Sequence, residues 1–175
     1  MKNKRMVPIM TNEIMQAPEL VEGEIIVRQD EDFIVVKTSE GKFKRKAKYK
    51  EYSSVKVETK EEKIWLSNLM DMNSEDDSAG LKNHVGAQIE VQDVILKKYD
   101  RINEETGEQE FGVITYLITP DRTAYVTSSK SVYFKIIEDM KLFGKPHEDG
   151  WENLTYQVTK KKGQNGDMIL IKLVG

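Results

Sequence analysis

The sequence predicts a mainly β protein with a minor helical part. Short runs rich in Val, Ile, Thr and Tyr recur along the chain and are separated by Gly, Pro, Asn and Asp turn signals. Two other segments combine helical spacing of apolar residues with a capping residue at the N-terminal end. The length of 175 residues favours one domain, or one domain with a substantial extension.

The N-terminal part is predicted to form an arm followed by strands. Residues 1–24 contain two prolines and show no clear period, and their recurring Met and Ile side chains favour docking on the domain or on a neighbouring copy. Strands are predicted over 24–28, 32–37 and 43–52, and the last of these is strongly basic. Self-association through the arm is therefore an expectation.

A short helix and an acidic loop follow these strands. Thr59 and Glu62 match a capping box that opens a helix extending to about residue 70. Residues 71–80 are rich in Asp, Glu, Asn and Ser, which is typical of a solvated loop and marks an internal boundary. The expected organisation is an arm over 1–24, a β-rich extension with helix and acidic loop over 25–80, and a domain over 81–175.

The last domain shows the clearest pattern. Strands are predicted over 88–100, 111–119, 123–127, 154–160 and 168–174. A helix is predicted over 132–143. Apolar positions in the first strand change parity between Val91 and Val94, which indicates a bulge. Five strands with a helix between the third and fourth is the order of the OB-fold barrel. Another small α+β sheet is the alternative.

Several classes of protein are excluded or disfavoured. The chain has no Cys, which excludes a disulfide framework, a zinc ribbon and a Cys nucleophile. No apolar run approaches the ~18 residues of a membrane span, so we expect a soluble protein of the cytoplasm with no membrane partner. His84 and His147 lie in no metal-binding spacing, and no Gly-rich phosphate loop is present. The prediction is a protein without metal, cofactor or enzymatic activity.

One segment favours nucleic-acid binding by charge and stacking. Residues 42–52 hold six basic and three aromatic side chains. In an extended strand Phe43, Arg45 and Tyr49 share one face, whereas the lysines occupy the other. Cations that follow phosphates beside rings that stack on bases suit single-stranded nucleic acid. The alternative is an edge strand protected from aggregation by Lys. The candidate residues are Lys42, Phe43, Lys44, Arg45, Lys46, Lys48 and Tyr49.

The last domain offers a second group of candidates. The second and third strands of an OB-fold usually present the binding surface, together with the loops that flank it. Two tyrosines lie on these strands, and a lysine run forms the tip of the last hairpin. The alternatives are core packing for the rings and solubility for the lysines. The candidate residues are Tyr99, Tyr116, Tyr125, Lys130, Trp151, Lys160, Lys161 and Lys162.

A family resemblance rests on one junction. Residues 123–134 read Thr-Ala-Tyr-Val-Thr-Ser-Ser-Lys-Ser-Val-Tyr-Phe and lead into a helix that ends at Leu142-Phe143-Gly144. Over about residues 85–175 the chain resembles OB-fold single-stranded DNA-binding proteins of bacteriophages and mobile elements of Gram-positive bacteria. The resemblance implies an accessory protein of phage DNA replication or recombination that coats single strands. Cellular relatives usually end in an acidic tail, whereas this sequence ends in a predicted strand.

The resulting hypothesis is sequence-independent binding of single-stranded DNA, with stacking worth roughly 1–3 kcal/mol per base. RNA is not separated from DNA by these features, because both offer phosphates and bases. The alternative function is a phage interaction or structural protein that binds a host or virion protein. The apolar arm and the net charge of −3 motivate that alternative.

Overall fold

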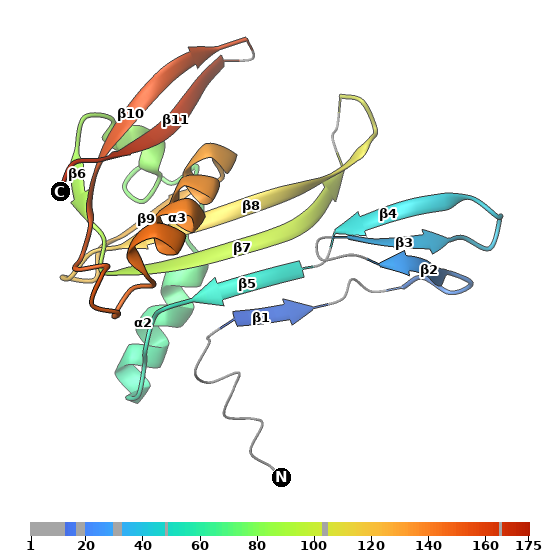
Figure 1. The fold of residues 1–175 in the computed structure, drawn as a ribbon, viewed down its shortest axis with the longest axis horizontal. Coiled ribbons are helices and arrows are strands. Elements are labelled where there is room, and N and C mark those ends of the chain that lie inside the picture. The colour runs from blue at the N-terminus through green and yellow to red at the C-terminus, as the bar shows by residue number, and fades with distance from the viewer. Residues whose placement is uncertain (1–12, 17–19, 30–32, 48, 103–104, 165) are drawn as a thin grey trace. The chain divides into compact units, whose positions relative to one another are not determined.

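The computed structural model describes residues 13–16, 20–29, 33–47, 49–102, 105–164 and 166–175. Its strands form three sheets that are accompanied by two α-helices and a short 3-10 helix, so the mainly β class is confirmed in the part described (Figure 1). The chain divides into two compact units. Unit 1 comprises 1–52 and 97–113, and unit 2 comprises 53–96 and 114–175. Residues 53–80 thus group with the last domain, unlike in the expected division.

Unit 2 contains the strands predicted for the last domain. These are β6 (Gln88–Glu90), β7 (Asp93–Ile102), β8 (Gln109–Ile118), β9 (Ala124–Thr127), β10 (Thr155–Gly163) and β11 (Gly166–Leu173), of which β7 and β8 continue into unit 1. The pairings run β11-β10-β6 and β7-β8-β9. The break between β6 and β7 lies at Val91 and Gln92, where the sequence predicted a bulge. Because β6 and β7 form the two parts of that predicted strand, its first part pairs with the predicted fourth strand, β10, and its second part neighbours the predicted second strand, β8.

The structure does not describe the closed barrel that this order led us to expect. Closure would require pairing between the two terminal strands, β9 and β11. Instead, the edge of β9 meets the segment before the 3-10 helix η2 (Leu81–His84), where the Val126 amide donates to the Ala79 carbonyl at 2.8 Å. The Ser129 hydroxyl after β9 donates to the Ile169 carbonyl of β11 at 2.8 Å, which brings the two edges together through a side chain.

Both predicted helices are present; the first begins at its expected cap, and the second begins two residues before the predicted start. Helix α2 (Lys60–Met70) has the full capping box between Thr59 and Glu62. Helix α3 (Lys130–Phe143) is capped by Ser129, whose hydroxyl accepts from the Val132 amide at 3.3 Å. In both helices a hydroxyl side chain at the N-cap therefore satisfies a backbone amide of the first turn.

An apolar cluster joins α2 to one face of the β7-β8-β9 sheet. Leu69 of α2 is buried in it, and Trp65 and Leu66 pack against its side. The strands and the segment before η2 contribute the other buried members, which are Ala79, Ile95, Tyr116, Ile118, Ala124 and Val126. Helix α2 therefore covers the face of the second and third OB-like strands that carries Tyr116.

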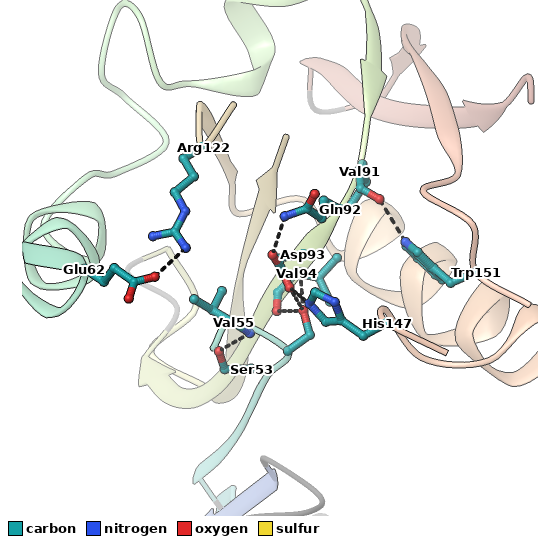
Figure 2. A network of polar contacts seen from close by, with 11 residues as sticks. Ser53, Val55, Glu62, Val91, Gln92, Asp93, Val94, Arg122, His147 and Trp151 are labelled. Carbon is teal, nitrogen blue, oxygen red and sulfur yellow. Dashed lines mark hydrogen bonds and ion pairs between the residues drawn. The ribbon is translucent and has the colours of Figure 1, made fainter. Parts of the chain in front are cut away.

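A polar network fixes the loop after α3 against the start of β7 (Figure 2). Asp93 Oδ1 accepts from the Ser54 hydroxyl at 2.9 Å and lies 2.5 Å from His147 Nε2. A few residues further on, the Trp151 indole nitrogen donates to the Val91 carbonyl at 2.8 Å. This bond satisfies the polar atom of the indole, so the whole ring can be buried.

Unit 1 holds the strands of the N-terminal part. Strands β2 (Ile25–Gln29), β3 (Phe33–Lys37) and β4 (Phe43–Ala47) form an antiparallel sheet in the order β2-β3-β4. Strand β5 (Tyr49–Ser53) instead lies between β1 (Glu13–Gln16) and β7 in the sheet of order β1-β5-β7-β8-β9. The basic segment predicted as one strand over 43–52 is therefore divided between two sheets.

Candidate nucleic-acid interface

The tip of the β10-β11 hairpin presents the lysine run as the sequence predicted. Lys160, Lys161 and Lys162, here called the lysine finger, are all exposed. Their ladder partners on β11 are Ile169, Met168 and Asp167 in that order. Lys160 lies 3.5 Å from Asp167, and half of each side chain stays exposed, so solvent screens this pair. The finger therefore carries more positive than negative charge beyond the core of unit 2.

The junction between β9 and α3 lies beside the base of the finger. The Ser129 hydroxyl contacts Ile169, the ladder partner of Lys160, and Lys130 follows Ser129 directly. Tyr125 of β9 is half-buried, and its ring meets the His84 ring edge-on at 4.8 Å between centroids. The sequence did not single out His84 as a partner of Tyr125, because the contact joins η2 to β9 across about forty positions.

Two predicted stacking residues lie in the interior of unit 2. Tyr116 is 1% exposed and Trp151 is 0% exposed. The Tyr116 hydroxyl donates to the Met70 carbonyl at 3.3 Å, below the turn that follows α2. The structure corrects the expectation that these rings face a binding cleft, because α2 covers one and the core surrounds the other.

In unit 1, one lysine of the basic segment lies on the packed face of its sheet. Lys46 is 7% exposed and forms an ion pair with Glu24 at 2.5 Å. The hydrogen bond from the Lys46 ammonium lowers the pKa of the Glu24 carboxyl. Ile34 and Val36 are completely buried on the same face. The alternation of side chains along β4 is as expected, but the burial of Lys46 corrects the expectation that this lysine faces nucleic acid.

The remaining predicted residues of unit 1 vary in their setting. Phe43 is 69% exposed, and Lys42 pairs loosely with the exposed Glu40 at 3.6 Å. Lys44 and Arg45 are exposed on opposite faces of β4. Tyr99 is half-buried, and its ring occupies the space above Gly112 where a side chain would clash. Lys48 and the side chain of Tyr49 lie outside the described residues.

Comparison with known proteins places the chain in a family. A family model described as phage single-stranded DNA-binding protein matches residues 46–173. The chain belongs to this family. A relative from Bacillus phage GA-1, named single-stranded DNA-binding protein, is 38% identical over 169 residues, which cover 95% of this chain and 97% of the relative. No solved structure matches the chain. The resemblance seen in the sequence is therefore confirmed.

No helix in the described part is long and apolar enough to cross a membrane. Within the same residues, no group of three or more His, Cys, Asp or Glu is placed to hold a metal ion.

Proposed function

We propose that this protein binds single-stranded DNA without sequence preference and coats it during phage DNA replication or recombination, with no enzymatic step of its own. The observation that carries the proposal is the family match over 46–173, which includes all of unit 2 except its last two residues. The similarity to the Bacillus phage GA-1 protein supports it over nearly the whole length of both chains.

The lysine finger supplies the electrostatic part of the mechanism. Its three ammonium groups stand on a hairpin that links the fourth and fifth OB-like strands, a loop that flanks the binding surface in such folds. Contacts with phosphates carry no sequence information, so they give affinity and register without selecting bases. Lys130, the first residue of α3, directly follows Ser129, whose hydroxyl donates to the strand that pairs with the finger, and it is a further candidate for a phosphate contact.

A partly accessible aromatic ring supplies the second part of the mechanism. Every base has a π-face, so stacking on an aromatic side chain tolerates any sequence and contributes roughly 1–3 kcal/mol per base. Tyr125 is the half-buried ring of unit 2 that lies nearest in sequence to Lys130. Bases in a duplex are already stacked and paired, so this mechanism favours single strands.

A fluorescence-anisotropy titration of the full chain tests the proposal. The probes are a labelled oligothymidine, an RNA of the same length and a duplex of the same length, each measured at several salt concentrations. We expect binding of oligothymidine at micromolar protein in low salt, weaker binding of the duplex, and a slope of about −0.7 per phosphate contact in log K against log salt. Absence of binding in low salt would refute the proposal, and equal affinity for the duplex would assign the chain to duplex DNA.

A further inference from the structure

The three-stranded sheet of unit 1 has two faces of different character. Directly opposite residues in an antiparallel pair place their side chains on the same face. The register puts Ile25, Lys37 and Phe43 in one row. Arg28, Val35 and Arg45 form the next row. These six residues make up what we call the basic face, whereas Ile34 and Val36 point to the opposite, packed face.

The basic face is open and positively charged. Phe43 is 69% exposed and Ile25 is 59% exposed. The Lys37 ammonium lies 6.0 Å from the centroid of the Phe43 ring, which confirms that both residues share the face. The strands β2, β3 and β4 carry five basic residues and no acidic one. Three of the five, Arg28, Lys37 and Arg45, belong to the basic face.

We propose that the basic face is a second contact site for single-stranded DNA, on which Phe43 stacks against a base while Lys37, Arg28 and Arg45 contact the neighbouring phosphates. The inference rests on the proposed function. The strands β2 and β3 precede residue 46, where the family match begins. The proposed site therefore lies on residues that precede the region matched by the family model.

Charge argues for nucleic acid rather than a second copy of the chain on this face. A symmetric contact between copies sets the same patch against itself. It would bring Arg28, Lys37 and Arg45 of one copy toward the same cations of the other, and such a juxtaposition is unfavourable. A polyanion neutralises these groups, and its bases cover the exposed Phe43 ring.

Neighbouring residues on β4 provide a test of the face. In the full chain, Arg45→Gln should weaken oligothymidine binding and reduce the salt slope by about 0.7, because one phosphate contact is lost. Lys44→Gln removes the same charge from the opposite face of the same strand and should have a smaller effect on both quantities. Lys56→Gln, an exposed lysine of unit 2, controls for the loss of one positive charge and should change affinity by less than about twofold.

The ring is tested separately from the charge. Phe43→Ala should weaken binding by about 5- to 100-fold. Phe43→Leu keeps an apolar side chain but removes the ring, and should weaken binding as well. Because Phe43 is mostly exposed, both variants should unfold at the wild-type urea concentration, which circular dichroism will check.

The outcomes separate this inference from the proposed function. If the wild-type chain fails to bind oligothymidine, the proposed function fails. If the wild type binds and changing the lysine finger weakens binding, while Phe43→Ala and Arg45→Gln bind normally, only the second site is refuted. A change in the mass of the Phe43→Ala protein in sedimentation, with unchanged DNA affinity, would also overturn the inference and assign the face to contacts between copies.

Discussion

Two sheets of this protein carry aromatic residues on their strands, but Tyr116 is buried in one sheet and Phe43 is exposed in the other. In unit 2, helix α2 covers the face of β7-β8-β9 that contains Tyr116, and the ring becomes part of the core. In unit 1, one face of β2-β3-β4 stays open and Phe43 is mostly exposed. What decides whether a ring is available to DNA is the element that packs over it.

This comparison predicts that the free energy of unfolding and the DNA affinity will respond to different substitutions. Removing a covered ring should reduce the free energy of unfolding and leave the DNA affinity of the folded protein unchanged. Removing an exposed ring or a finger lysine should do the reverse. The predictions below test this separation from the largest expected effect to the smallest.

Trp151→Ala should lower the free energy of unfolding by about 3–5 kcal/mol, because it leaves a large cavity and removes the bond to the Val91 carbonyl. Urea unfolding followed by circular dichroism measures the change, and Phe43→Ala is the comparison with an exposed ring. A variant of wild-type stability that loses DNA affinity would show that Trp151 binds DNA, as the sequence had indicated.

Changing Lys160, Lys161 and Lys162 together to Gln should weaken oligothymidine binding by about 10- to 100-fold at moderate salt and reduce the salt slope by about 2. The stability should change little, since these side chains are exposed. The matched control changes Lys56, Lys60 and Lys63, three exposed lysines before and within α2, to Gln. Equal losses in both triple variants would mean that net charge, not the finger, determines binding.

Tyr156→Phe should reduce the free energy of unfolding by about 1–3 kcal/mol. The Tyr156 hydroxyl donates to the buried Asp139 at 2.7 Å, which links β10 to α3, and its loss removes one donor from that carboxylate. Burial and the neighbouring Asp139 also raise the pKa of the Tyr156 hydroxyl well above its ordinary value. An unchanged unfolding midpoint would show that this link does not stabilise unit 2.

The smallest expected effect is a change in the pH dependence of stability at acidic pH when Glu62 is replaced. Backbone amides of Thr59 and Glu58, together with Arg122 at 2.8 Å, lower the pKa of Glu62 from 4.5 to about 2 (Figure 2). Because the folded pKa is the lower one, the stabilisation is complete above about pH 4.5 and is lost as the pH falls toward 2. As the pH is lowered between these values, the midpoint temperature of thermal unfolding should fall less steeply in Glu62→Gln than in the wild type. Equal slopes of midpoint against pH in the two proteins would contradict this assignment.

Local signals in the sequence identified much of this fold. The capping box at Thr59 identified the start of α2, the helical spacing identified α3 to within two residues of its start, and the change of parity between Val91 and Val94 marked the break between β6 and β7. Each of these features depends on residues that are close together in the chain. The lysine finger was found for the same reason, because its hairpin is local.

The features that the sequence did not reveal all depend on distant contacts. Nothing near Tyr116 indicates that α2 covers it, and nothing near Lys46 indicates its pairing with Glu24. The edge of β9 is occupied by Ala79, which precedes it by more than forty positions, so the barrel closure was expected where the structure shows another partner. The strand register, which the sequence does not give, is what places Arg28 and Lys37 on the basic face.

A crosslinking map tests most directly whether DNA meets the open surfaces and not the covered rings. The full chain is bound to an oligonucleotide that contains photoreactive halogenated uracil, irradiated, digested and analysed by mass spectrometry. We predict crosslinks at Phe43 in β4 and on the peptide of the lysine finger, and none at Tyr116 or Trp151. Crosslinks at Tyr116 or Trp151, with neither open surface labelled, would contradict the account.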